Sequence, residues 1–246
     1  MLFEKRNRVF IGRFPDLHTG PLVHGFSTRK GGHSRPPYDS LNLGGKTADD
    51  PADVEKNRRD FFRSMQIRLE DVAMPLQVHG ARIVQAERGG IYPATDGLIT
   101  DSPGLVLSVL VADCLSIFLY DPDRPAVGLV HAGWRGSSMN IGAKAVEAMA
   151  KGFRSEPGRL RAWMGPSIGP CCYEVGEEVA SQFPAACVKN NHLDLWTCNR
   201  LQLESAGLQA NAIEIASLCT KCHPELFYSH RGSGGKAGRM MAVFGL

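Results

Sequence analysis

Cys114 and His131 flank a segment that reads as a β-hairpin, and their side chains could do chemistry together. Two apolar runs, LSIFLY and AVGLV, are joined by the turn DPDRP at residues 121–125. Folding this stretch about its centre near Pro122 and Asp123 predicts that Cys114 lies opposite His131, with Cβ atoms about 4.5–5.5 Å apart on one face of the sheet. A register slip of one residue would place the two side chains on opposite faces. In the predicted register, a thiolate meets an imidazole at the strand ends.

Ordinary structural roles are the alternative for these residues. A free cysteine is among the most buried residue types, and a histidine at a strand end often only completes a hydrogen bond. The glycines after His131, in HAGWRG, leave room for a ligand and favour a functional site. His79 in PLQVHGARIV is a third candidate, because it ends a strand-like run and is followed by Gly80. Two histidines and one thiolate are the ligand set of a catalytic zinc site, although His79 alone reads as a turn residue.

The elements that must position these residues alternate between helices and strands. A helix is predicted from Pro51, with Asp50 as N-cap and Val54, Phe61, Phe62 and Met65 on its inner face. Further helices are expected at 138–151, with Gly152 as its stop, at 177–183 and at 195–206. Strands are expected at 76–84, 97–99, 106–111, 117–120, 127–130, 161–164 and 240–244. This order predicts an α+β fold with mixed β-sheets, as one domain over residues 1–246 or two closely packed halves.

Composition and charge exclude several classes of function. The chain has 246 residues, 43% of them hydrophobic and 22% charged, and a net charge of only +3 with scattered basic residues. These values are typical of an ordinary globular protein and do not favour a nucleic-acid partner. The N-terminus lacks an apolar signal region, and the most hydrophobic stretch, 105–120, is interrupted by Asp113. We therefore expect no membrane partner and a soluble, cytoplasmic protein; the sequence does not indicate its oligomeric state.

Seven cysteines, an odd number, do not suggest a disulfide framework, so most should be reduced thiols. Cys171 and Cys172 are vicinal and poorly placed for an ordinary bridge. Cys219 and Cys222 have the CxxC spacing of half a zinc ribbon, but no second CxxC completes four ligands. A structural zinc site at Cys219 and Cys222 is therefore not expected.

Dispersed motifs resemble those of one known family. They are FSTRKGG, SLNLG, QVHG, ADC, VHAGWRG, GPSIGPCCYEVG and the C-terminal AGRM, in this order along nearly the whole chain. The chain resembles the YfiH family, whose members carry the labels laccase-domain protein, polyphenol oxidase, purine nucleoside phosphorylase and peptidoglycan editing factor. This resemblance implies a zinc site at His79, Cys114 and His131, and a four-layer α/β/β/α arrangement shared with cytotoxic necrotizing factor deamidases. It also implies phosphorolysis of adenosine, inosine, guanosine and methylthioadenosine, with possible deamination of adenosine.

Phosphorolysis requires groups that hold phosphate and the nucleoside. Guanidinium groups and backbone amides are the usual clamps for phosphate, and the motifs put Arg29 and Arg135 forward for this role. Asn42 and Gln77 are candidates for hydrogen bonds to the nucleoside, and Trp134 for stacking on the base. The alternative for the two arginines is an ordinary solvated surface charge. The alternative for the two amides is a structural hydrogen bond within the protein. The sequence departs from the family pattern at His33, an added polar group, and in SHRGSGGKAGR, which puts a role for Arg231 in doubt.

Other functions stay open at this stage. Cys114 and His131 could act without metal as nucleophile and base of a hydrolase or amidase, or the chain could be a noncatalytic metal-binding or cell-wall quality-control protein. Zinc deaminases use a Glu in an HxE motif, and the one HxE here, His223-Pro224-Glu225, contains none of the three candidate ligands. The chain has eight histidines and no HxH pair, so it lacks the ligands of a multicopper laccase. Copper binding in vitro at the three candidate ligands, with slow phenol oxidation, is compatible with the sequence.

Overall fold

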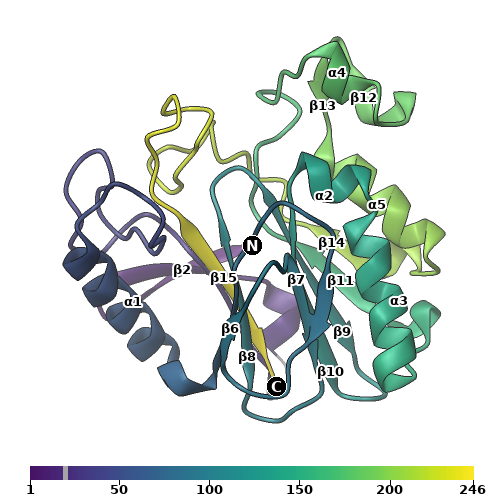
Figure 1. Ribbon diagram of the computed structural model, residues 1–246, viewed down its shortest axis with the longest axis horizontal. Coiled ribbons are helices and arrows are strands. Elements are labelled where there is room, and N and C mark those ends of the chain that lie inside the picture. Colours follow the sequence, from purple (N-terminus) through teal and green to yellow (C-terminus); the bar gives the residue numbers. More distant parts are fainter. Residues whose placement is uncertain (19–21) are drawn as a thin grey trace.

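Two β-sheets pack face to face and are covered on their outer faces by helices. The computed structural model describes residues 1–18 and 22–246. Helix α1 (Pro51–Met65) lies on the outer face of one sheet, and α3 (Ile141–Phe153) with α5 (Leu195–Ser205) on the outer face of the other (Figure 1). This confirms the predicted α+β class and the four-layer α/β/β/α arrangement. None of the described helices is long and apolar enough to span a bilayer.

The first sheet has seven strands in the order β1-β2-β3-β15-β8-β4-β6. Most neighbours are antiparallel, but β4 runs parallel to both β8 and β6. The bounds are β1 (Leu2–Arg6), β2 (Val9–Arg13), β3 (Val23–Ser27), β4 (Val72–Pro75), β6 (Gly90–Tyr92), β8 (Val106–Val111) and β15 (Met240–Gly245).

The second sheet has six strands in the order β14-β11-β9-β10-β7-β5, with parallel pairs at both edges. Its strands are β5 (Ile83–Gln85), β7 (Gly97–Thr100), β9 (Leu115–Asp121), β10 (Ala126–Ala132), β11 (Arg161–Met164) and β14 (Ile213–Ile215). A short pair, β12 (Val188–Lys189) and β13 (His192–Leu193), lies near α2 (Trp134–Ser138) and α4 (Glu177–Ala180). Single 3-10 turns occupy Pro15–His18, Leu69–Asp71, Pro157–Arg159, Ala185–Cys187 and Ala210–Ala212.

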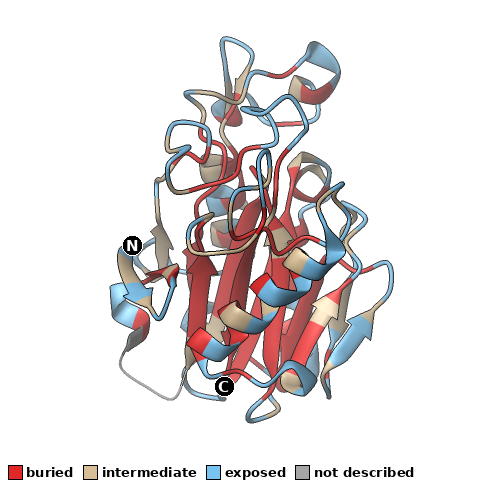
Figure 2. Ribbon diagram, turned by 90° about the vertical axis from the view of Figure 1, so that its left-hand side faces the viewer, coloured by how far each residue is buried: buried red, intermediate tan, exposed pale blue. Residues whose placement is uncertain are grey.

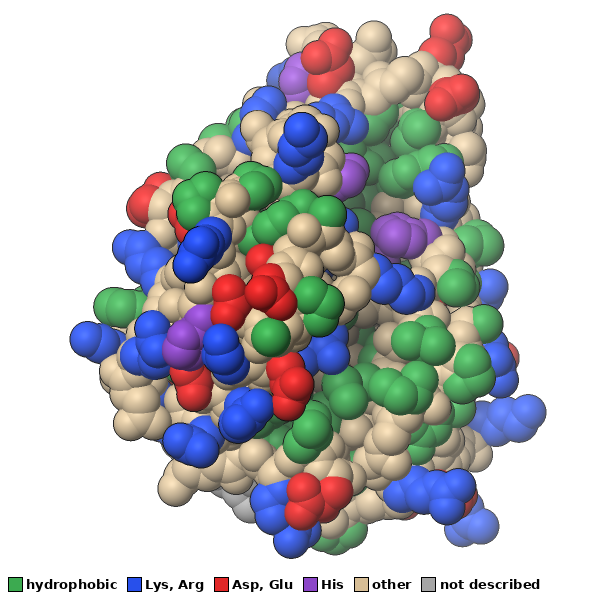
Figure 3. All heavy atoms as spheres, turned by 60° about the vertical axis from the view of Figure 1, so that its left-hand side comes forward, with side chains coloured by type: hydrophobic (Ala, Val, Ile, Leu, Met, Phe, Trp, Pro, Cys, Tyr) green, Lys and Arg blue, Asp and Glu red, His purple; other side chains and the backbone are tan. Residues whose placement is uncertain are grey.

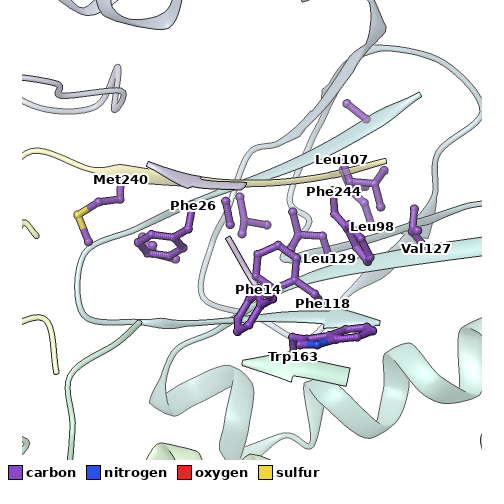
Figure 4. Close-up of a cluster of buried hydrophobic side chains, with 14 of the residues drawn as sticks. Phe14, Phe26, Leu98, Leu107, Phe118, Val127, Leu129, Trp163, Met240 and Phe244 are labelled. Carbon is purple, nitrogen blue, oxygen red and sulfur yellow. The ribbon is translucent and has the colours of Figure 1, made fainter. Parts of the chain in front are cut away.

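The central core lies between the two sheets, where the strands are buried along most of their length (Figure 2). Phe118 on β9 stands at its middle (Figure 4). Its ring contacts Phe14 edge-on at 5.6 Å and Phe244 at 5.5 Å between ring centroids. Separate apolar clusters fill the spaces between each sheet and its helices. The segments that carry the candidate site are therefore attached to a well-packed double layer of sheets.

Helix α1 begins and packs as the sequence predicts. The Asp50 side chain accepts a hydrogen bond from the Ala52 N–H, and Pro51 occupies the first turn. The predicted inner face is buried against the first sheet. Gln66 ends the helix in a left-handed conformation with φ 59°.

Three predicted elements are wrong in their bounds. The helix predicted at 177–183 is the short α4, which ends at Ala180. The helix predicted from residue 138 begins at Ile141, because Asn140 adopts a left-handed conformation and separates α2 from α3. It also continues through Gly152 to Phe153 and ends at left-handed Arg154. The strand predicted over 76–84 is mostly a loop between β4 and β5. The N–H groups at residues 78–80 bind the Asp96 carboxylate instead of a partner strand.

The central hairpin forms, but its register differs by two residues from the prediction. His131 pairs with Ser116 instead of Cys114, so the continued register sets Cys114 opposite Gly133. Asp121 explains the shift, because its Oδ1 accepts the N–H groups of Asp123 and Arg124 and sets the turn at residues 122–125. A shift of two residues preserves the face on which each side chain lies. Cys114 and His131 therefore still share a face.

The Phe118→Ala substitution should lower the free energy of unfolding by about 3–5 kcal/mol, because it removes a ring that is 1% exposed from the centre of the core. The measurement is urea denaturation followed by circular dichroism. Leu69→Ala, at a side chain that is 56% exposed, is the control and should change the value by less than about 0.5 kcal/mol. Equal effects of the two substitutions would contradict the packing described above.

Candidate functional site

Three segments bring His79, Cys114 and His131 together. His79 lies in the loop after β4, Cys114 in the turn between β8 and β9, and His131 near the end of β10. Their ligand atoms all lie within 4.8 Å of one another, and the two imidazole rings are 4.9 Å apart at an interplanar angle of 80°. Gly133 leaves room for this group, since a Cβ there would stand 3.0 Å from Cys114 Sγ. The donor set of two imidazoles and one thiol fits a zinc ion with an open fourth position.

Asp96 is a fully buried carboxylate that organises two of these three residues. Its Oδ1 accepts hydrogen bonds from His131 Nδ1 and from the His79 N–H, both at 2.9 Å. Its Oδ2 accepts the N–H groups of Val78 and Gly80 at 3.1 and 2.8 Å. The carboxylate thus fixes the path of the His79 loop and the orientation of the His131 ring. Because Nδ1 is engaged, Nε2 of His131 is left for Cys114 or a metal ion.

Two residues at the site adopt left-handed backbone conformations that non-glycine residues rarely take. His79 has φ 59°, and Asp113, directly before Cys114, has φ 82°. Such conformations persist where the surroundings over-determine them. The Asp96 carboxylate does so for His79. For Asp113, the side chain accepts hydrogen bonds from Thr220 Oγ1 and the Arg231 N–H, and the carbonyl accepts the Ile168 N–H.

Charge attraction within the site outweighs its burial. Burial raises the pKa of the Cys114 thiol, but the charge and hydrogen bond of His131, aided by His79, lower it to about 6. Burial lowers the pKa of His131, but the Cys114 thiolate and the Asp96 carboxylate raise it to about 9. Burial also raises the pKa of Asp96, and hydrogen bonds from His131 and from backbone N–H groups bring it below its usual value. Without a metal ion, Cys114 and His131 therefore form a thiolate–imidazolium pair near neutral pH.

The three residues line one cavity of about 560 Å³, within the size range of small-molecule sites. Histidine and basic side chains stand beside a hollow on the face shown in Figure 3. The basic residues that line the cavity are Lys46, Arg58, His230 and Arg239. Burial lowers the pKa of Arg58 and of Arg239, which is the expected effect of partial desolvation of a guanidinium. Apolar lining is contributed by Met74, Leu76, Ile91, Leu110 and Met241.

The two amide side chains predicted to bind the nucleoside make bonds within the protein. Gln77 lines the cavity, but its amide donates to the Leu110 carbonyl and accepts the Leu110 N–H, both at 2.8 Å. Asn42 is fully buried and lies outside the cavity lining. Its Oδ1 accepts the N–H groups of Gly44 and Arg239 at 3.0 and 2.9 Å. Asn42 thus positions the backbone of Arg239, which does reach the cavity.

The predicted phosphate-binding arginines also lie outside the cavity lining. Arg29 donates to the carbonyls of Asp39 and Pro224, and its guanidinium stacks over the Tyr228 ring at 4.8 Å. Arg135 is exposed and stacks over Trp134 at 4.3 Å.

The two departures from the family pattern also have structural contacts. His33 Nε2 lies 2.8 Å from Asp60 Oδ2 on α1, apart from the cavity. Arg231 holds Asp113 through its backbone N–H, and its side chain donates to the Glu174 carbonyl.

Asp96 and the basic residues that line the cavity are not among the site residues predicted from the sequence. The sequence signal for Asp96 is weak: it is an acidic residue directly before a run that predicts a buried strand. Arg239 lies in the C-terminal AGRM motif, one of the motifs that carry the family resemblance.

A second group of possible metal ligands includes the CxxC pair. The sulfur atoms of Cys171, Cys172, Cys219 and Cys222 all lie within 4.8 Å of one another. The chain has no second CxxC, but Cys171 and Cys172 place two further possible ligands beside this pair. The fold brings the vicinal cysteines to Cys222 across 50 and 51 residues of sequence.

Comparison with known proteins shows relatives along nearly the whole chain. The chain is 39% identical over 243 residues to a purine nucleoside phosphorylase of Deinococcus radiodurans, covering 95% of this chain and 92% of the relative. It is 36% identical over 246 residues to purine nucleoside phosphorylase YlmD of Bacillus subtilis, covering 92% and 88%. The crystal structure of YlmD from Geobacillus stearothermophilus matches with a TM-score of 0.92 at 34% identity, covering 99% of this chain and 98% of that one. A Bacillus licheniformis structure described as hypothetical protein YfiH matches with a TM-score of 0.90, 34% identity and the same coverage.

The family match spans residues 23–246, which include every residue of the two ligand groups. It agrees with the relatives and with the motifs from which a YfiH resemblance was predicted. The chain belongs to the family described as multi-copper polyphenol oxidoreductase laccase and is a relative of the YfiH and YlmD proteins.

Proposed function

We propose that this protein is a zinc-dependent purine nucleoside phosphorylase that acts in the cavity beside His79, Cys114 and His131. One observation carries the proposal: this ligand group and the guanidinium groups of Arg58 and Arg239 line the same cavity. The names of the relatives in Deinococcus radiodurans and Bacillus subtilis support the same activity. The proposed substrates are adenosine, inosine, guanosine and methylthioadenosine, each with phosphate.

In this proposal, His79, Cys114 and His131 hold the zinc ion. A bound zinc ion would supply Lewis acidity, polarising a hydroxyl or a water molecule. Asp96 keeps the His131 ring oriented, a support that metal-binding histidines commonly have. Copper binding at the same ligands in vitro remains part of the proposal, because imidazole and thiolate ligands also suit copper.

The basic lining of the cavity suits a dianionic nucleophile. Arg58, Arg239, Lys46 and His230 would bind phosphate and lower the electrostatic cost of its approach to the anomeric carbon. As the phosphate oxygen bonds to this carbon, the bond to the purine breaks, the departing base takes up the proton that phosphate loses, and the free base and the sugar 1-phosphate are released. The apolar lining around Leu76 and Ile91 suits the purine ring.

The proposal does not include the chemistry of a four-copper laccase. Among the described residues, the groups of three or more close ligands are the two discussed above. The chain has eight histidines and no HxH pair, whereas a blue-copper site and a three-copper cluster need more imidazoles. Adenosine deamination would need a proton shuttle, and the one HxE of the sequence, His223-Pro224-Glu225, lies outside the cavity lining. The cysteines are free thiols, which suits the cytoplasm as the proposed location.

A metal-free hydrolase is the second candidate. The chain of contacts from Asp96 through His131 to Cys114 has the order of a carboxylate, imidazole and nucleophile in triad enzymes. In that case Cys114 would attack an acyl carbon and His131 would move the proton. Metal content and phosphate dependence separate the two candidates.

The proposed activity should depend on phosphate. Purified protein incubated with inosine or adenosine should form free base and ribose 1-phosphate only when phosphate is supplied, as measured by chromatography. Cys114→Ala should lose at least about 100-fold of the rate and thereby exclude a contaminating phosphorylase. Free ribose formed equally fast without phosphate would indicate a hydrolase, and inosine formed from adenosine would reveal deamination.

Asp96→Asn should weaken zinc binding at this site about 10–100-fold, because the His131 ring and the His79 loop lose their shared acceptor. The measurement is the zinc concentration that protects Cys114 from alkylation, read on its tryptic peptide by mass spectrometry. Asp101→Asn is the matched control. This exposed carboxylate directly follows strand β7, which Asp96 directly precedes. Unchanged protection in a folded Asp96→Asn protein would contradict the role given to Asp96.

The pH dependence of Cys114 alkylation should reveal the ion pair in metal-free protein. The thiolate is the reactive form, so the rate should rise with pH around a midpoint of about 6. For an ordinary cysteine, the midpoint of this pH dependence is at about pH 8.5. His131→Asn should move the midpoint upward, because the imidazolium that favours the thiolate is removed. A midpoint above about 8 in the unsubstituted protein would exclude the pair.

A further inference from the structure

Four cysteines from two loops meet at one end of the second sheet. Cys171 and Cys172 follow strand β11, and Cys219 and Cys222 follow strand β14. These two strands are parallel neighbours, so the chain leaves both strands at the same end of the sheet. An isolated parallel bridge between Ser167 and Cys219 continues the pairing beyond the strands. The two loops are therefore aligned before either reaches its cysteines.

The sulfur geometry fits one metal ion and does not fit a disulfide. Cys222 Sγ lies 3.6 Å from Cys171 Sγ and 3.5 Å from Cys172 Sγ. A disulfide would need about 2.05 Å. Four sulfurs around a tetrahedral zinc ion, at zinc–sulfur distances of about 2.3 Å, stand about 3.8 Å apart. The observed spacing is close to that value.

The surroundings of Cys219 suit a thiolate ligand. Its sulfur accepts a hydrogen bond from the Gly169 N–H at 3.3 Å, and the backbone of Cys222 donates to it as well. Gly169 must lack a side chain, because a Cβ there would stand 2.8 Å from the Trp196 ring. Cys219 is buried, whereas Cys171 and Cys222 are exposed, so an ion can reach the group from solvent. Four thiolates with one Zn²⁺ leave a charge of −2, which the N–H groups and neighbouring Lys221 offset in part.

We propose that Cys171, Cys172, Cys219 and Cys222 form a structural zinc site, separate from the candidate active site. The four thiols bind one Zn²⁺ and release four protons, with no change of oxidation state. A site with four protein ligands has no open position for a substrate, which assigns it a structural role. This proposal does not depend on zinc at His79, Cys114 and His131.

The zinc site would also support Cys114. Thr220, inside the CxxC loop, donates from Oγ1 to Asp113 Oδ1 at 2.6 Å, and its N–H donates to the Ser167 carbonyl at 3.0 Å. The Ile168 N–H binds the Asp113 carbonyl at 2.9 Å. Both loops that hold the cysteines therefore also hold Asp113, which directly precedes Cys114 in a left-handed conformation. The four cysteines thus act as positioning residues for Cys114.

The test uses a variant that lacks the other ligand group. Cys114→Ala with His131→Ala, purified under reducing conditions, should retain close to one zinc per chain by mass spectrometry of the metal. X-ray absorption at the zinc edge should show four sulfur neighbours at about 2.3 Å. Protein without metal, an iron ion in place of zinc, or a Cys171–Cys222 disulfide on peptide mapping would each overturn the proposal.

Two further variants locate the ion. Adding Cys171→Ser and Cys222→Ser to that variant should remove its zinc, whereas adding Cys187→Ala, at a cysteine outside the group, should leave it bound. If the variant with Cys171→Ser and Cys222→Ser does not fold, alkylation of the native chain tests whether the four thiols bind zinc. The four thiols should then react only after a chelator removes zinc, and immediate alkylation of all four in zinc-containing protein would overturn the proposal.

Discussion

The buried carboxylate of Asp96 is the interaction on which the candidate site depends. It accepts three successive backbone N–H groups of the His79 loop and the Nδ1 of His131. A buried carboxylate without partners would be strongly destabilising, so these four donors and the carboxylate require one another. The loop after β4 leaves the first sheet, while His131 lies on the second. One side chain therefore joins the two sheets at the point where the ligands meet.

The sequence predicted those parts of the fold and site that rest on local patterns. The N-cap at Asp50 and the apolar face of α1 could be predicted because both depend on residues close together in the sequence. The Cys114 and His131 pairing was predicted on the correct face although its register was wrong, since an error of two residues preserves side-chain orientation. The exact register depends on how Asp121 organises the turn, which hydrophobic alternation does not encode.

The features that could not be predicted depend on contacts between distant segments. Residues 76–84 have a pattern that predicts a strand, but the N–H groups at residues 78–80 bind Asp96, which lies well beyond them in sequence. Cys171 and Cys172 meet the CxxC pair because β11 and β14 are parallel neighbours, and pairing between such distant strands has no local signature. Arg239, directly before strand β15, lines the cavity. The guanidinium of Arg29 donates to backbone carbonyls instead and lies outside the cavity lining.

The two ligand groups differ in the chemistry that their surroundings allow. His79, Cys114 and His131 supply three ligands at the wall of a cavity, which leaves room for a reacting molecule. The cysteine group supplies four ligands at a loop junction outside that cavity, which leaves none. Asp113 connects them, because the loops that carry the four cysteines hold it and it directly precedes Cys114. Under the two proposals, a closed four-cysteine site would hold in place the strained backbone of Asp113, which directly precedes the Cys114 thiolate.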